Sequence, residues 1–176
     1  MNEELDSNVT GTSLLVAVDG SKHSEKVVDF ACTLGKTLSA RVALIFVCPH
    51  AEIQKEYEKL YTEPRIIPKE DNVMGEPQAP RRANPDAMGI DEYCRVVGDK
   101  VLSQLKAKVE STGLKCERIF EVGNPAIKIR DIANERKVDM IIVGLHGLHG
   151  ADRLRSLGSV SRRIIENSSR PIVVVP

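Results

Sequence analysis

Residues 138–175 read VDMIIVGLHGLHGADRLRSLGSVSRRIIENSSRPIVVV, and this stretch decides the fold. A short apolar run, Met140 to Val143, stops at a loop with glycines at positions 144, 147 and 150, and Gly158-Ser159 then begins a helical pattern. In such a strand–loop–helix unit, glycines let main-chain N–H groups approach an anion, and the helix points its own unpaired N–H groups at the same place. The pattern predicts an α/β unit whose loop is suited to phosphate.

Apolar runs and helical repeats alternate along the rest of the chain. The runs over 14–18 and 42–47 are apolar throughout, which is typical of parallel strands covered on both faces. Helical spacing begins after the first strand, with Ser21 or Ser24 as its N-cap, and recurs over 90–109. It begins again at Asn124-Pro125, with Asn124 as N-cap and Pro125 at the first helical position. The sequence therefore predicts an α/β fold, a doubly wound five-stranded parallel sheet in a three-layer α/β/α sandwich. The strands are expected at 14–18, 42–47, 116–122, 140–143 and 172–175.

The helix that begins near Gly158 has apolar residues at helical spacing. We expect Val160, Ile164 and Ile165 to face the core from this helix.

The organisation of the chain is predicted from where this regularity is interrupted. Residues 1–12 are polar and acidic and predict a flexible leader, and residues 13–176 predict a single domain. The stretch 49–91 holds six of the nine prolines and predicts an insertion, with a short helix at Glu52–Tyr61. The insertion is a lid, a partner-binding arm or plain disorder, and the sequence does not choose among these.

Composition narrows the class of partner. The formal net charge is zero, which removes the electrostatic argument for a nucleic acid or a membrane surface. No apolar run approaches the roughly 20 residues of a membrane-spanning helix, and we expect a cytoplasmic protein. The four cysteines form no CxxC pair, so we expect reduced, mostly buried thiols rather than disulfides or metal ligands.

Gly144, Gly147, Gly158 and Ser159 are the strongest candidates for a ligand site. Either the loop amides and the Ser159 hydroxyl hold phosphate oxygens, or these residues form a tight turn that needs no ligand. Asp19 ends the first strand, where a carboxylate can accept a hydrogen bond from a ribose hydroxyl or help to hold a metal ion on the phosphates. An Asx turn is the alternative for Asp19.

No motif in the chain indicates catalysis. His146 is either a donor to phosphate or a solvated loop histidine. A Walker loop, GxxxxGK[ST], is absent from the sequence, and no nucleophile–base pair is visible. We therefore expect binding rather than turnover.

Several separated stretches resemble the universal stress protein family. They are LLVAVDGSKHSEKVVDFA from Leu14, VALIFV from Val42, VGNPAIKIRDIANERKVDMIIVGLHG from Val122 and LGSVSRRIIENSSRPIVVVP from Leu157. The resemblance implies an adenine nucleotide alpha hydrolase-like fold with strand order 3-2-1-4-5. It also implies a homodimer joined through the last strand, Ile172–Val175.

One branch of this family binds ATP through Gly-x2-Gly-x9-Gly-Ser/Thr. Here Gly144 and Gly147 match the first half and Gly158-Ser159 the second, with ten residues rather than nine between Gly147 and Gly158. Because one added loop residue changes the closure entropy little, ATP binding is expected.

The resemblance also implies which residues contact the nucleotide. By this resemblance, Ala17, Val18 and Asp19 hold the adenine and the ribose, and Val47 packs against the base. The phosphate loop is lined by Val143, Gly144, His146 and Gly147. Its far side is lined by Gly158, Ser159, Val160 and Ser161.

The implied cofactor is ATP, with Mg or Mn, and the implied function is a dimeric stress-response module that binds ATP without turnover. Two alternatives stay open: a nucleotide-free dimerisation and signalling module, and a slow ATPase or phosphotransfer enzyme that uses Asp19 or His146.

Overall fold

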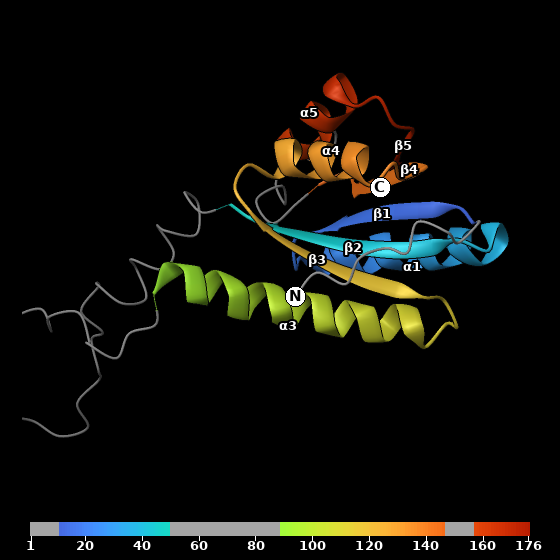
Figure 1. The fold of residues 1–176 in the computed structure, drawn as a ribbon, viewed down its shortest axis with the longest axis horizontal. Helices are drawn as coiled ribbons and strands as arrows, with labels where there is room; N and C mark the ends of the chain where they lie inside the picture. The colour runs from blue at the N-terminus through green and yellow to red at the C-terminus, as the bar shows by residue number, and fades with distance from the viewer. Residues whose placement is uncertain (1–10, 50–88, 147–156) are drawn as a thin grey trace, which may run out of the picture.

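A computed structural model describes residues 11–49, 89–146 and 157–176 (Figure 1). In these residues five strands form one parallel sheet in the order β3-β2-β1-β4-β5, which confirms the predicted fold. The elements along the chain are β1 (Ser13–Val18), α1 (Lys22–Leu38), β2 (Arg41–Cys48), α3 (Ile90–Glu110), β3 (Cys116–Val122), α4 (Pro125–Glu135), β4 (Met140–Gly144), α5 (Ser159–Asn167) and β5 (Ile172–Val175).

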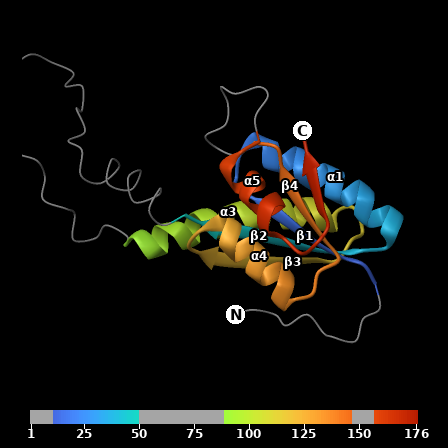
Figure 2. The ribbon, with the colours of Figure 1, turned by 90° about the horizontal axis from the view of Figure 1, so that it is seen from above.

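The sheet forms the middle of three layers. Helices α1 and α3 cover one face, and α4 and α5 cover the other (Figures 1 and 2). Leu14 and Val16 of β1 belong to the core cluster under α1 and α3, whereas Leu15 belongs to the cluster under α4 and α5. Because successive side chains of a strand point to opposite faces, this double cover explains why β1 is apolar throughout.

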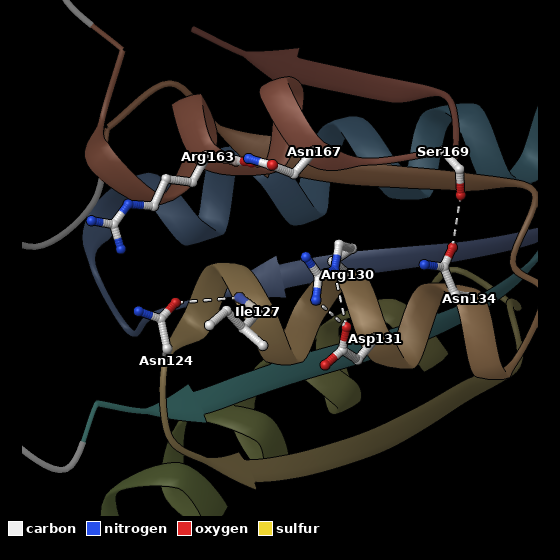
Figure 3. Close-up of polar contacts among 8 residues, drawn as sticks. All are labelled: Asn124, Ile127, Arg130, Asp131, Asn134, Arg163, Asn167 and Ser169. Atoms are coloured by element: carbon white, nitrogen blue, oxygen red, sulfur yellow. Dashed lines mark hydrogen bonds and ion pairs between the residues drawn. The ribbon is translucent and has the colours of Figure 1, made fainter.

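The helix starts follow the capping residues that the sequence indicated. The Asn124 side chain accepts a hydrogen bond of 3.2 Å from the Ile127 amide (Figure 3). Pro125 follows at the first turn of α4. The Ser21 hydroxyl accepts a hydrogen bond of 3.3 Å from the Ser24 amide at the start of α1. Each side chain satisfies an amide that the helix itself leaves unpaired, so both helix starts are fixed locally.

Helix α3 packs unusually close to the sheet at Gly98. A Cβ atom built on Gly98 would lie 2.5 Å from Cδ2 of Phe120. The Phe120 ring is stacked on that of Phe46, with 6.2 Å between the ring centroids. Gly98 therefore makes room for the aromatic pair between α3 and strands β2 and β3.

One predicted core position is wrong. Ile165 is 43 % exposed, whereas Ile164 is fully buried and Val160 packs against the same cluster. Successive helix residues are turned by about 100°, so the short helix α5 buries only a narrow stripe through Ile164, and Ile165 falls outside it.

The expectation of four reduced thiols is also wrong. Cys48 and Cys94 form a disulfide with their Cα atoms 6.0 Å apart, and both residues are fully buried. Their separation of 46 residues hides the pair in the sequence, because α3 brings Cys94 back beside the end of β2. Cys32 and Cys116 are free, as expected.

Some predictions lie outside the described residues. They are the helix Glu52–Tyr61, most of the proline-rich insertion, and the leader up to residue 10. Among the helices that the structure describes, none combines the length and the apolar character that a membrane span requires.

Candidate functional site

The candidate site lies where β1 and β4 end side by side at the centre of the sheet. Val16 is aligned with Ile142, two residues before the last residue of each strand, so Asp19 follows β1 next to Gly144. From β1 the chain continues to β2 and β3 on one side, and it crosses later to β4 and β5 on the other. This reversal of strand order is where open α/β sheets form a crevice for ligands.

Asp19 organises the turn between β1 and α1. Its Oδ1 atom accepts hydrogen bonds from the Ser24 hydroxyl at 2.7 Å and from the Ser21 amide at 3.0 Å. The Asp19 amide in turn donates to the Ser24 hydroxyl at 3.0 Å. The Asx turn that the sequence allowed is therefore present, and it holds the carboxyl group at the end of the strand.

Gly144 ends β4 directly against a side chain of α1. A Cβ atom on Gly144 would lie 2.6 Å from Cδ2 of His23 and 3.1 Å from the carbonyl oxygen of His146. Every other amino acid would therefore displace the His23 ring or the loop that follows. The glycine that opens the loop has a packing reason of its own, independent of any ligand.

The start of α5 is tied to the end of β4. The Gly158 amide donates to the Leu145 carbonyl at 2.8 Å, and the Ser161 hydroxyl donates to the Gly144 carbonyl at 2.6 Å. Gly158 is the N-cap of α5 and supplies no side-chain hydrogen bond. The first amides of α5 are thus held beside the strand end without a capping side chain, an arrangement suited to an anion.

The apolar residues of the predicted site divide between the two faces of the sheet. Ala17, Val47, Val143 and Val160 all belong to the cluster under α4 and α5. Val18 points to the opposite face, into the cluster under α1 and α3. Only the main chain of Val18 can therefore face a ligand that rests on the first group.

Polar side-chain contacts link α4 to its neighbours on this side of the sheet. The Ser169 hydroxyl donates to the Asn134 side chain at 2.9 Å, and Figure 3 shows these two side chains pointing toward each other. Lys128 of α4 forms an ion pair of 2.9 Å with Glu121 at the end of β3, and this hydrogen bond raises the pKa of Lys128. Both contacts anchor α4, one to the segment after α5 and the other to the end of β3.

The structure brings most of the predicted site residues together at this end of the sheet. Gly147 and Ser159 differ from the rest. Gly147 lies outside the described residues. Ser159 is exposed at the first turn of α5, whereas Ser161 is 6 % exposed and acts through Gly144. Within the described part of the chain, no group of three or more His, Cys, Asp or Glu side chains could hold a metal ion.

Sequence reasoning missed His23. Its Nε2 atom lies 3.0 Å from the Val175 carbonyl oxygen, and its ring centroid lies 6.5 Å from that of His146. In the sequence, His23 is marked only by its place four residues after Asp19, the aspartate that ends the first strand. Its contacts with Gly144 and Val175 depend on the folded structure.

Comparison with known proteins agrees with this arrangement. Residues 12–176 match the model of the Universal stress protein family. The chain belongs to this family.

Individual relatives cover almost the whole chain. The Universal stress protein YxiE of Bacillus subtilis is 30% identical over 165 residues, which span 92% of this chain and 97% of that protein. The solved structure of MJ0577, a protein of Methanocaldococcus jannaschii, has a TM-score of 0.68 at 23% identity and covers 95% of this chain and 96% of that one.

A universal stress protein from Archaeoglobus fulgidus, solved in complex with dAMP, has a TM-score of 0.58 at 19% identity. It covers 96% of this chain and 100% of that one. At these identities, the two solved structures support the fold of this family member.

Proposed function

We propose that this universal stress protein binds ATP, accompanied by Mg²⁺ or Mn²⁺, and acts as a dimeric regulatory module in a stress response without turning the nucleotide over. The observation that carries the proposal is the N-terminus of α5, held at the end of β4 by Gly158 and Ser161 and left without a capping side chain. Helix amides in this position stabilise phosphate oxygens. The dAMP bound by the relative from Archaeoglobus fulgidus supports the adenine nucleotide as the ligand class.

The rest of the nucleotide is assigned to the central strands. The base rests on the apolar group of Ala17, Val47 and Val143, and the ribose lies toward Asp19. Asp19 is the carboxylate at this strand end and would face the cation that accompanies the phosphates. The chain's own part in this scheme is to bind and orient the nucleotide.

The dimer is assigned to the edge of the sheet. Within the described structure β5 lies at the edge of the sheet and pairs only with β4 (Figure 2). Its residues Ile172, Val173 and Val174 are half-buried. An edge strand of this kind presents unpaired main-chain groups that a second copy can cover. We also propose a cytoplasmic location, the expectation that the sequence raised from its lack of a long apolar segment.

The test begins with protein purified without added nucleotide. Heat denaturation followed by ion-exchange chromatography at 260 nm is expected to release ATP, and a titration with Mg-ATP is expected to saturate. Released ADP together with measurable hydrolysis would favour a slow ATPase. An empty supernatant and a flat titration would favour the nucleotide-free dimer. In that case Gly144 is needed only to make room for the His23 ring, and Asp19 only to form the turn before α1.

A pair of variants makes the test specific. Gly158 has φ −58°, which any residue adopts, so Gly158→Val should fold while it obstructs the approach of phosphate to the α5 amides. Gly11→Val adds the same side chain just before β1, at the opposite end of the sheet. We expect Gly158→Val to weaken ATP binding at least about tenfold, as loss of several charge-assisted hydrogen bonds requires. Equal binding by both variants would contradict the proposed site.

A further inference from the structure

We propose that His23 is a positioning residue that couples the nucleotide loop to the C-terminal strand, so that ATP binding and dimerisation strengthen each other. This inference rests on the proposed function, because it concerns the same loop and the same edge strand.

Three segments meet at one carbonyl oxygen. The oxygen of Val175, the last residue of β5, accepts a hydrogen bond of 2.7 Å from the Leu145 amide at the start of the glycine loop. The same oxygen lies 3.0 Å from Nε2 of His23 on α1. Because a carbonyl oxygen only accepts, Nε2 must carry the hydrogen atom in this contact. His23 therefore holds α1, the loop and β5 at a single point.

The His23 ring also occupies the space above Gly144. The ring comes so close that even a methyl group on Gly144 would lie 2.6 Å from it, and His146 follows in the loop with its ring centroid 6.5 Å away. A shift of the loop from Gly144 to His146 therefore moves His23 or breaks its bond to Val175. Packed interiors pass on such displacements because they deform little.

The two proposed binding events act on opposite sides of this contact. Phosphates on the loop would hold the segment that contains the Leu145 amide in place, whereas a second copy on β5 would hold the strand that carries the Val175 oxygen. Gly144 and Val175 are register partners in the β4–β5 ladder, so the two sides adjoin. When two ligands favour the same arrangement of a shared element, each raises the affinity for the other by the same factor.

The experiment measures this factor directly. The dimer dissociation constant is determined by analytical ultracentrifugation with and without saturating Mg-ATP, together with the Kd for Mg-ATP. In the wild type we expect ATP to tighten the dimer at least about fivefold, within the usual range of coupling between sites. In His23→Leu the factor should fall to less than half of the wild-type factor, since the His23 donor is lost and only the Leu145 amide still bonds the Val175 oxygen. His23→Gln, which returns an N–H donor at comparable reach, should restore part of the coupling.

Two further variants keep the result interpretable. His23→Asn is too short to reach Val175 and replaces His23→Leu if that variant does not fold. Lys26→Gln changes an exposed residue of the same helix and should keep the wild-type factor.

The outcomes separate the inference from the proposed function. If the wild type does not bind ATP, or does not dimerise, the proposed function fails and the inference fails with it. If the wild type does both, but ATP leaves the dimer constant unchanged or the folded His23→Leu or His23→Asn variant keeps the full factor, the inference alone is overturned.

Discussion

The Ser161 hydroxyl donates a hydrogen bond of 2.6 Å to the Gly144 carbonyl, although 17 residues separate the two along the chain. The serine is buried on the first turn of α5, and the glycine is the last residue of β4. The loop between them therefore begins and ends at points fixed to each other.

Replacing Ser161 should affect stability and ligand binding together. Ser161→Ala leaves the Gly144 carbonyl without this donor, and loss of a partly buried hydrogen bond costs about 1 kcal/mol of the free energy of unfolding. Because the start of α5 would no longer be held to the strand end, we expect the Kd for Mg-ATP to rise about tenfold, or about 1.4 kcal/mol. Urea denaturation and isothermal titration calorimetry measure the two effects.

Ser159 offers the matched control for this prediction. It lies two residues earlier, is exposed, and is assigned to phosphate rather than to the fold. Ser159→Ala should weaken ATP binding and leave the free energy of unfolding unchanged. A Ser161→Ala variant that binds ATP like the wild type would show that the bond to Gly144 does not shape the loop.

The close approach of α3 to the sheet predicts a steric effect at Gly98. Alanine is a better helix former than glycine by about 1 kcal/mol, but the added Cβ would meet the Phe120 ring at 2.5 Å. Because that ring is stacked on Phe46, we expect the clash to prevail and Gly98→Ala to lose about 1 to 3 kcal/mol of unfolding free energy.

Two comparisons isolate the clash in urea denaturation. At Gly35 of α1 the one close contact of a new Cβ would be the flexible end of Leu114, at 2.9 Å, while Val42 lies at an ordinary 3.7 Å, so Gly35→Ala should be milder. In a double-mutant cycle, the cost of Gly98→Ala should shrink when Phe120 is also replaced by leucine. Additive costs would rule out the ring as the cause.

The strands and helix starts were predictable because their determinants are local. A run such as Leu14 to Val18 specifies a strand buried on both faces, and the Asn124-Pro125 pair specifies a helix start through its own capping bond. The loop glycines were identified for the same reason. The reason for a glycine at position 144 was not predicted. The sequence suggested phosphate binding or a tight turn, whereas the structure shows that Gly144 also makes room for the His23 ring.

What the sequence could not predict depends on distant residues meeting. Cys48 and Cys94 are joined because α3 returns to the end of β2, and no spacing rule registers a pair 46 residues apart. His23 acquires its role from Val175, which lies 152 residues later. Both cases concern the same carboxyl end of the sheet, where the segments of the candidate site converge.

The disulfide predicts a definite thiol count. Protein denatured without reductant should titrate two thiols per chain, from Cys32 and Cys116, and four after reduction. Because the bridge closes a loop between residues 46 apart, Cys48→Ala should lower the free energy of unfolding by about 2 to 4 kcal/mol.

The free thiols provide the contrast for that measurement. Burial, followed by the Glu110 charge, raises the pKa of the Cys116 thiol to about 12, so iodoacetamide at pH 8 should modify it slowly in the native protein. Four titratable thiols in the denatured, unreduced protein would show that the bridge does not form under the conditions of purification.

Asp139 predicts the direction of a pH effect on stability. Its Oδ2 atom accepts hydrogen bonds from the Ser13 amide at 2.8 Å and from the Ser13 hydroxyl at 2.9 Å, just before β4 and at the start of β1. These bonds lower the pKa of the Asp139 carboxyl from its ordinary 3.8, and the bond from the Ser13 amide has the larger effect. A group whose pKa is lowered by folding stabilises the protein above its ordinary pKa, and this contribution is lost as the pH falls through the folded value.

We therefore expect wild type to be more stable than Asp139→Asn at pH 6, and the difference to vanish as the pH falls below 3.8. The difference should be small, since the side chain is exposed and solvent screens it. Urea denaturation at several pH values measures it, with Glu135→Gln, an exposed carboxylate on α4, as the control for general charge removal. If the two variants lose stability in parallel across this range, the Ser13 contacts do not stabilise the ionised form.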